Sequence, residues 1–241
     1  MNVLPSPFTA CQPRPLRGMA LAALVLSLAA ATIGMGSAEP LGDWTIVFIH
    51  VPAAWLSLML YAAAIVAGTA ALHSPARLPG GLLAAIAPVG AAAAFLALWT
   101  GLASQQARGA WWGWDARLIC ELVLLLLFAG LIALHSRMDD AERAERGGAV
   151  LVLTGALNIP IIYLSVDWWH TLHERAAASV GRSPLVLTAM AVMTLAFCLY
   201  AGALVLARLE AFAREREAGA RNFGSARAEG GNAPTPAKEQ Q

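Results

Sequence analysis

Six long apolar stretches follow one another along this chain, separated by short polar or charged links. Stretches of roughly 17 to 25 apolar residues match the length that an α-helix needs to cross the hydrocarbon core of a bilayer. They run near Gly18–Met35, Trp44–Leu72, Leu82–Leu102, Leu118–Leu134, Ala149–Leu164 and Leu185–Leu209. The pattern predicts an all-α membrane protein with six transmembrane helices.

Composition supports lipid as the main solvent of the chain. Of its residues, 59% are hydrophobic and 13% are charged, whereas a soluble domain usually carries about 25% charged residues. The arginines are spread over links and a tail, so no basic face for nucleic acid is expected. We predict a cytoplasmic N-terminal segment (1–17), a membrane domain (18–209) and a cytoplasmic, partly disordered tail (210–241), because the tail has little apolar surface to bury.

The first apolar stretch has some features of a signal peptide. Arg14 and Arg17 precede it and small residues follow it. Its length and the five further apolar stretches favour a membrane span instead.

The distribution of arginine predicts the orientation of the helices. If the N-terminus is cytoplasmic, the inner links and the tail hold more arginine than the outer links, as the positive-inside rule requires. Both termini are then cytoplasmic, and three segments share the outer face: residues 44–52, 104–117 and 165–184. The aromatic and polar residues that are unusual in a membrane protein collect in these three segments.

The second of these outer segments is rich in tryptophan. Trp111, Trp112 and Trp114 lie within four residues of one another and are followed by Asp115 and Arg117. Indole rings can form a flat apolar platform for a planar aromatic ligand. A membrane-interface aromatic belt is the alternative. Asp115 and Arg117 form an ion pair with each other, or Arg117 meets an acidic group of a ligand.

Histidines mark the other two outer segments. His50 lies within an apolar run, two residues before Pro52, and an ionisable residue there is by default a functional hypothesis. The alternative is a neutral histidine that hydrogen-bonds a neighbouring helix. His170 and His173 follow a tryptophan pair and are three residues apart, so a helical turn would put them on one side; solvated loop residues are the alternative.

Together these residues favour haem over other ligands. Neutral imidazole ligates iron, apolar rings can cover a porphyrin, and arginine can meet its propionates. A zinc site would need three or four clustered ligands, and a hydrolase would need a nucleophile beside a base.

Four motifs in these segments resemble a known family. They are HVPAAW (50–55), WWGWDARL (111–118), NIPII (158–162) and VDWWHTLHE (166–174). The combination resembles haem exporter protein C, or CcmC, of cytochrome c maturation, and the resemblance covers roughly residues 44–206.

The resemblance implies a non-catalytic haem-binding protein of the bacterial inner membrane, with its haem site facing the periplasm. It implies that His50 and His173 ligate haem iron and that the protein presents haem to the chaperone CcmE, aided by CcmD and the ABC-type CcmA and CcmB. Several positions depart from the usual pattern: His170 stands where many relatives carry Asn, Arg108 stands where a tryptophan is common, and Ile119 and Cys120 stand where Thr-Ser-like residues are common. Arg108 is a candidate propionate contact.

Two other classes of function remain as alternatives. A haem b-containing, quinone-linked redox subunit would normally bury both histidine ligands within helices, whereas His173 is expected in a loop. A small-molecule permease would need polar residues near the middle of the membrane, and the first, third and sixth stretches are almost bare of them.

Overall fold

The structure is a computed structural model of the chain, and it describes residues 14–36, 46–73, 78–106, 116–138, 140–168 and 184–230. These residues are almost entirely helical, and no strand occurs among them. The helices are α1 (Arg14–Gly36), α2 (Val47–His73), α3 (Leu78–Gln106), α4 (Ala116–Arg137), α5 (Ala141–Gly155), α6 (Asn158–Trp168) and α8 (Pro184–Gly230).

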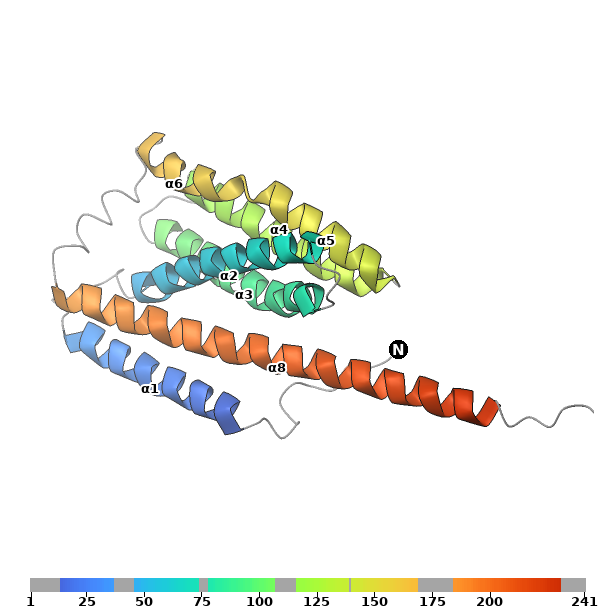
Figure 1. Ribbon diagram of the computed structural model, residues 1–241. Helices are drawn as coiled ribbons and strands as arrows, with labels where there is room; N and C mark the ends of the chain where they lie inside the picture. The colour runs from blue at the N-terminus through green and yellow to red at the C-terminus, as the bar shows by residue number, and fades with distance from the viewer. Residues whose placement is uncertain are drawn as a thin grey trace, which may run out of the picture.

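The helices run up and down in one bundle, with α1 packed against α8 at its side (Figure 1). Five segments are long and apolar enough to cross a membrane, and a shorter apolar helical segment spans Gly18–Thr32. The prediction of an all-α, multi-pass membrane protein with six helices is confirmed.

The fifth predicted span consists of two helices rather than one. α5 ends at Gly155, a short turn covers Ala156 and Leu157, and α6 begins at Asn158. The backbone N–H groups in the first turn of a helix have no acceptor within that helix. Pro160, which lacks an N–H, therefore loses no hydrogen bond in the first turn of α6. Asn158 and Pro160 break the apolar pattern of this stretch, and the helix is interrupted there.

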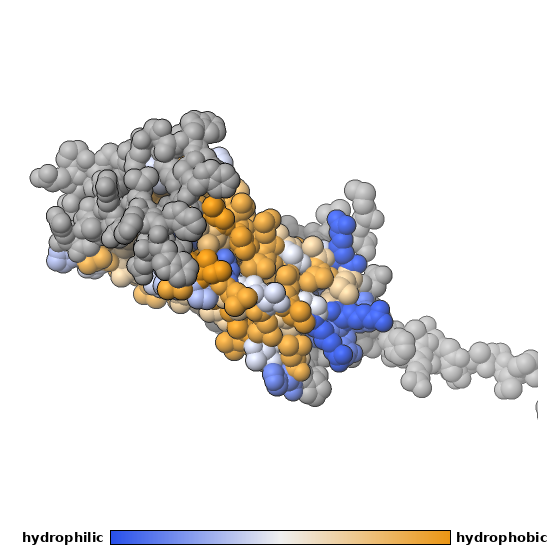
Figure 2. Space-filling view, turned by 90° about the horizontal axis from the view of Figure 1, so that it is seen from above, coloured by the Kyte–Doolittle hydropathy of each residue, from blue (hydrophilic) through white to orange (hydrophobic). Residues whose placement is uncertain are grey.

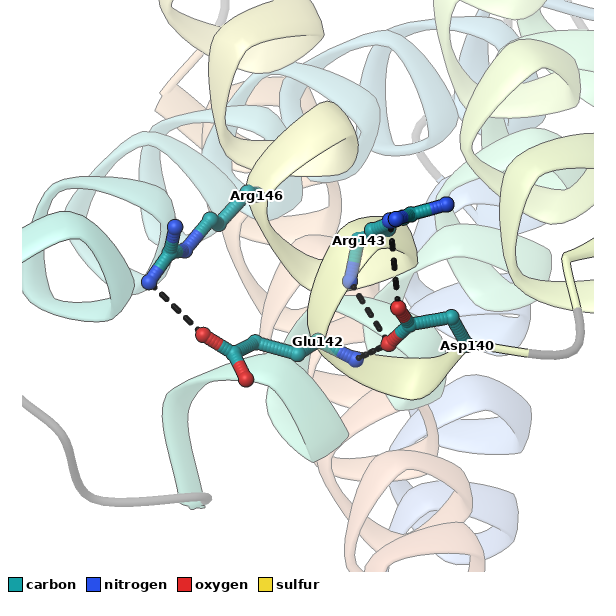
Figure 3. Close-up of polar contacts among 4 residues, drawn as sticks. All are labelled: Asp140, Glu142, Arg143 and Arg146. Carbon is teal, nitrogen blue, oxygen red and sulfur yellow. Dashed lines mark hydrogen bonds and ion pairs between the residues drawn. The ribbon is translucent and has the colours of Figure 1, made fainter.

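Two helices extend further than their apolar stretches suggest. The charged residues before the fifth stretch form the first turns of α5, where the carboxylate of Asp140 accepts hydrogen bonds from the backbone N–H groups of Glu142 and Arg143 (Figure 3). Such an N-cap satisfies donors that the helix start leaves open. At the other end of the chain, α8 continues through the first part of the predicted tail to Gly230, while residues 231–241 lie outside the described part.

The core lies among α2, α3, α4 and α5. Its largest fully buried side chains include Tyr61 and Phe128. Their rings pack edge to face, with 5.5 Å between the ring centroids. A smaller cluster of Ala53, Ala54 and Ala97 joins α2 to α3. Such small residues let two membrane helices approach closely.

Large apolar side chains also cover the outside of the bundle. Val66 is 70% exposed and Leu157 is 69% exposed, and Figure 2 shows a wide hydrophobic surface bordered at one end by hydrophilic residues. A soluble monomer rarely exposes apolar surface on this scale. Contact with lipid chains explains it.

Candidate functional site

Several helix ends meet at one end of the bundle, which we call the site end. It is defined by the starts of α2, α4 and α8 and by the ends of α3 and α6, which lie together on the left of Figure 1. These ends border all three segments that the sequence predicts to share a face. Trp111, Trp112, Trp114, Asp115, Arg108, His170 and His173 lie outside the described residues, whereas His50 and Arg117 are described.

His50 lies in the first turn of α2 and is partly buried against α3. Its Nδ1 is 2.9 Å from the carbonyl oxygen of Ala97 and 3.2 Å from Oγ1 of Thr100. A carbonyl oxygen can only accept, so in the neutral ring Nδ1 carries the hydrogen and donates it. The lone pair of the imidazole is therefore on Nε2. A backbone carbonyl that fixes a histidine in this way is the usual support of a metal-ligating histidine.

Gly101, which has no side chain, leaves room for the His50 ring to pack against α3. A β-carbon added to this glycine would lie 3.1 Å from Cε1 of His50 and 2.5 Å from Cδ2 of Leu118. The absence of a side chain thus lets α2 and α4 both approach α3 here. The position of His50 depends on this close approach.

Pro52 lies inside α2, which begins at Val47. The helix therefore starts before the proline. Because proline has no N–H, the carbonyl of Phe48 lacks its usual intrahelical donor.

Among the described residues, His50 belongs to no group of three His, Cys, Asp or Glu side chains that could hold a metal ion. An imidazole can also ligate iron that a porphyrin already holds.

Arg117 lies in the first turn of α4 and is partly buried. One turn further along α4 is Glu121, which is 5% exposed and attracts Arg117 electrostatically. The sequence-based interpretation considered Asp115 or a ligand as the partner of Arg117 and missed Glu121. The signal was present, because Glu121 is the only charged residue within the fourth apolar stretch.

Glu121 is part of a buried polar cluster that joins three helices. Oγ of Ser57, on α2, donates to Oε1 of Glu121 at 2.8 Å. Nδ2 of Asn158, on α6, donates to the carbonyl oxygen of Cys120 at 3.0 Å. Ser57 and Asn158 are themselves buried. The cluster ties α2 and α6 to the same part of α4.

The heme exporter protein C family has a sequence model that matches residues 3–223 of this chain. The chain belongs to this family. The match includes all the described helices except the last residues of α8, and it includes all three segments at the site end. The resemblance seen in the four motifs is confirmed.

Relatives in the heme exporter protein C family come from several bacteria. The chain is 44% identical over 203 residues to "Heme exporter protein C" of Bradyrhizobium diazoefficiens, which covers 77% of each chain. It is 45% identical over 150 residues to the protein of that name from Escherichia coli K12, covering 59% of this chain and 61% of the relative.

A plant relative has a different name. The "Putative cytochrome c biosynthesis ccmC-like mitochondrial protein" of Marchantia polymorpha is 32% identical over 138 residues, which covers 57% of this chain and 58% of the relative.

Proposed function

We propose that this chain binds haem at the site end and presents it to the chaperone CcmE during the maturation of c-type cytochromes. Haem is cargo in this proposal, and the protein is a non-catalytic carrier. The names of its relatives, which are haem exporters and a cytochrome c biosynthesis protein, support this reading.

The observation that carries the proposal is the hydrogen bond from Nδ1 of His50 to the carbonyl oxygen of Ala97. This bond holds the imidazole in the tautomer whose Nε2 can ligate iron, and it fixes the plane of the ring. Because the ring is already fixed, haem binding costs less side-chain conformational entropy.

The other proposed haem contacts come from the segments that leave the site end. His173 is the second axial ligand, and Trp111, Trp112 and Trp114 form the porphyrin platform. Asp115 orients this loop, and Arg117 meets a propionate. An arginine suits that role because its guanidinium can form paired hydrogen bonds with a carboxylate.

The location and partners complete the proposal. The protein resides in the bacterial inner membrane with its site end facing the periplasm, and it works with CcmD and with the ABC-type CcmA and CcmB. Both termini are then cytoplasmic. Green fluorescent protein fused after Gln241 should fluoresce and alkaline phosphatase fused there should be inactive; the opposite pair of results contradicts the orientation.

The test of haem binding is the visible spectrum of the purified full chain after expression in cells that make haem. The wild type should show a Soret band, and both His50→Ala and His173→Ala should lose most of it at equal protein concentration. His73→Ala is the matched control, because His73 lies at the opposite end of α2 and, among the described residues, its ring bonds to the carbonyl of Thr69 in its own helix. A Soret band that survives in His50→Ala at wild-type intensity removes His50 from the site.

Delivery to CcmE is tested separately from binding. Haem-loaded protein should transfer haem to purified CcmE, and the His50→Ala variant should transfer little. Haem that stays on the wild-type chain in the presence of CcmE contradicts the role in delivery.

A further inference from the structure

Glu121 is an acidic side chain inside an otherwise apolar membrane helix. It lies in the second turn of α4, within the segment Ala116–Arg137 that is long and apolar enough to span a membrane. Ionisable residues at such depth are rare, and they face the interior of the bundle, pair with a partner and mark functional regions. Glu121 follows this pattern, because it is buried and hydrogen-bonded.

The partner of Glu121 lies on the helix that carries His50. Ser57 follows His50 by seven residues, or two turns, so both side chains lie on the same side of α2. His50 bonds to α3 through the carbonyl of Ala97, and Ser57 bonds to α4 through Glu121. These two contacts together fix the rotation of α2 about its own axis.

The same part of α4 also connects to the other proposed haem contacts. Arg117 lies one turn before Glu121 and is attracted by it. Asn158 bonds to the carbonyl of Cys120, directly beside Glu121, and it begins α6, the helix that leads to His173. Residues 120 and 121 of α4 are therefore joined both to α2, which carries His50, and to α6, which precedes the segment with His173.

We propose that Glu121 is a positioning residue of the haem site. Through Ser57 it holds α2 at the rotation that aims His50 at the iron. Glu121 does not touch haem in this arrangement. The inference rests on the proposed haem-binding function and adds a residue to it that no motif of the family resemblance supplied.

Three variants and one control test this role. Glu121→Leu removes the acceptor of the Ser57 hydrogen bond, Ser57→Ala removes its donor, and Glu121→Gln keeps an acceptor at the same place. The control is Tyr61→Phe. Tyr61 lies one turn after Ser57 on α2, is fully buried, and donates to the carbonyl of Val152 at 3.0 Å on α5. The control thus breaks a buried bond between helices that does not involve α4.

The measurements are haem affinity, by titration of the Soret band, and the spin state of the bound ferric iron, for equal amounts of folded full-length protein. Glu121→Leu should bind haem about tenfold more weakly and convert part of the six-coordinate low-spin haem to a high-spin form. Ser57→Ala should change both quantities in the same direction. Glu121→Gln and Tyr61→Phe should keep the wild-type spin state.

Two results overturn the positioning role. One is a wild-type affinity and spin state in Glu121→Leu. The other is a change in Tyr61→Phe as large as in Glu121→Leu, which would show a general loss of packing. If Glu121→Leu does not accumulate in the membrane, Ser57→Ala decides, and an unchanged spin state there overturns the proposal. A wild-type chain that binds no haem would overturn the proposed function itself, which is a different result.

Discussion

Gly101→Ala should weaken haem binding through the proposed ligand His50 at only a modest cost to the stability of the fold. The added β-carbon would lie 3.1 Å from Cε1 and 3.5 Å from Nδ1 of His50, and 2.5 Å from Cδ2 of Leu118. The end of the leucine side chain can turn away. The imidazole can move only by stretching its bond to the carbonyl of Ala97, which is 2.9 Å long.

The expected magnitudes follow from these two contacts. Overpacking costs about 1–3 kcal/mol, and alanine in a helix regains roughly 0.5–1 kcal/mol over glycine. The free energy of unfolding should therefore fall by only about 1–2 kcal/mol. Weakening the hydrogen bond of His50 should reduce the free energy of haem binding by about 1 kcal/mol. This loss corresponds to roughly fivefold weaker haem binding.

The assay is a haem titration beside a thermal melt, with Gly81→Ala as the matched control. Gly81 is also in α3, and a β-carbon there would meet nothing within 4 Å. Gly81→Ala should bind haem like the wild type and melt at the same or a slightly higher temperature. If Gly101→Ala behaves like Gly81→Ala in both measurements, the packing argument for His50 is refuted.

Three further changes test the surroundings of the site and the fold. Thr100→Val keeps the bond from His50 to Ala97 and should weaken haem binding at most about threefold; a complete loss in the titration would show that the hydroxyl is the main support of His50. Asp140→Ala removes the N-cap of α5 and should lower the free energy of unfolding by about 1 kcal/mol, seen as a lower melting temperature with unchanged haem affinity. Gly155→Ala would place a β-carbon against Oη of Tyr61 and the side chain of Leu127 and should destabilise the fold by about 1–3 kcal/mol; a wild-type melting temperature would contradict this packing.

The helices could be predicted from the sequence because lipid imposes a length on every span. Apolar stretches alone located the membrane-spanning helices, and the Asn158 and Pro160 pair located the interruption between α5 and α6. The polar ends of helices were harder to predict. The first turns of α5 and the last turns of α8 are rich in Ala, Arg and Glu, which form helices well in water, and pairs such as Arg146–Glu142 and Arg214–Glu210 support them.

His50 could be picked out from the sequence, but the hydrogen bonds that hold it could not be predicted. His50 stood out as an ionisable residue in an apolar stretch, and Glu121 could have been found by the same rule. The bonds of His50 to Ala97 and of Glu121 to Ser57 join residues 47 and 64 positions apart. Such partners depend on how the helices pack, and no local pattern in the sequence reveals them.

The most direct test of haem binding between two histidines is electron paramagnetic resonance of the ferric, haem-loaded full chain. Ligation by His50 and His173 should give a low-spin signal of two imidazole ligands in the wild type, replaced by a high-spin signal in His50→Ala and in His173→Ala, and retained in His73→Ala. A low-spin signal that persists unchanged in either of the first two variants would contradict it.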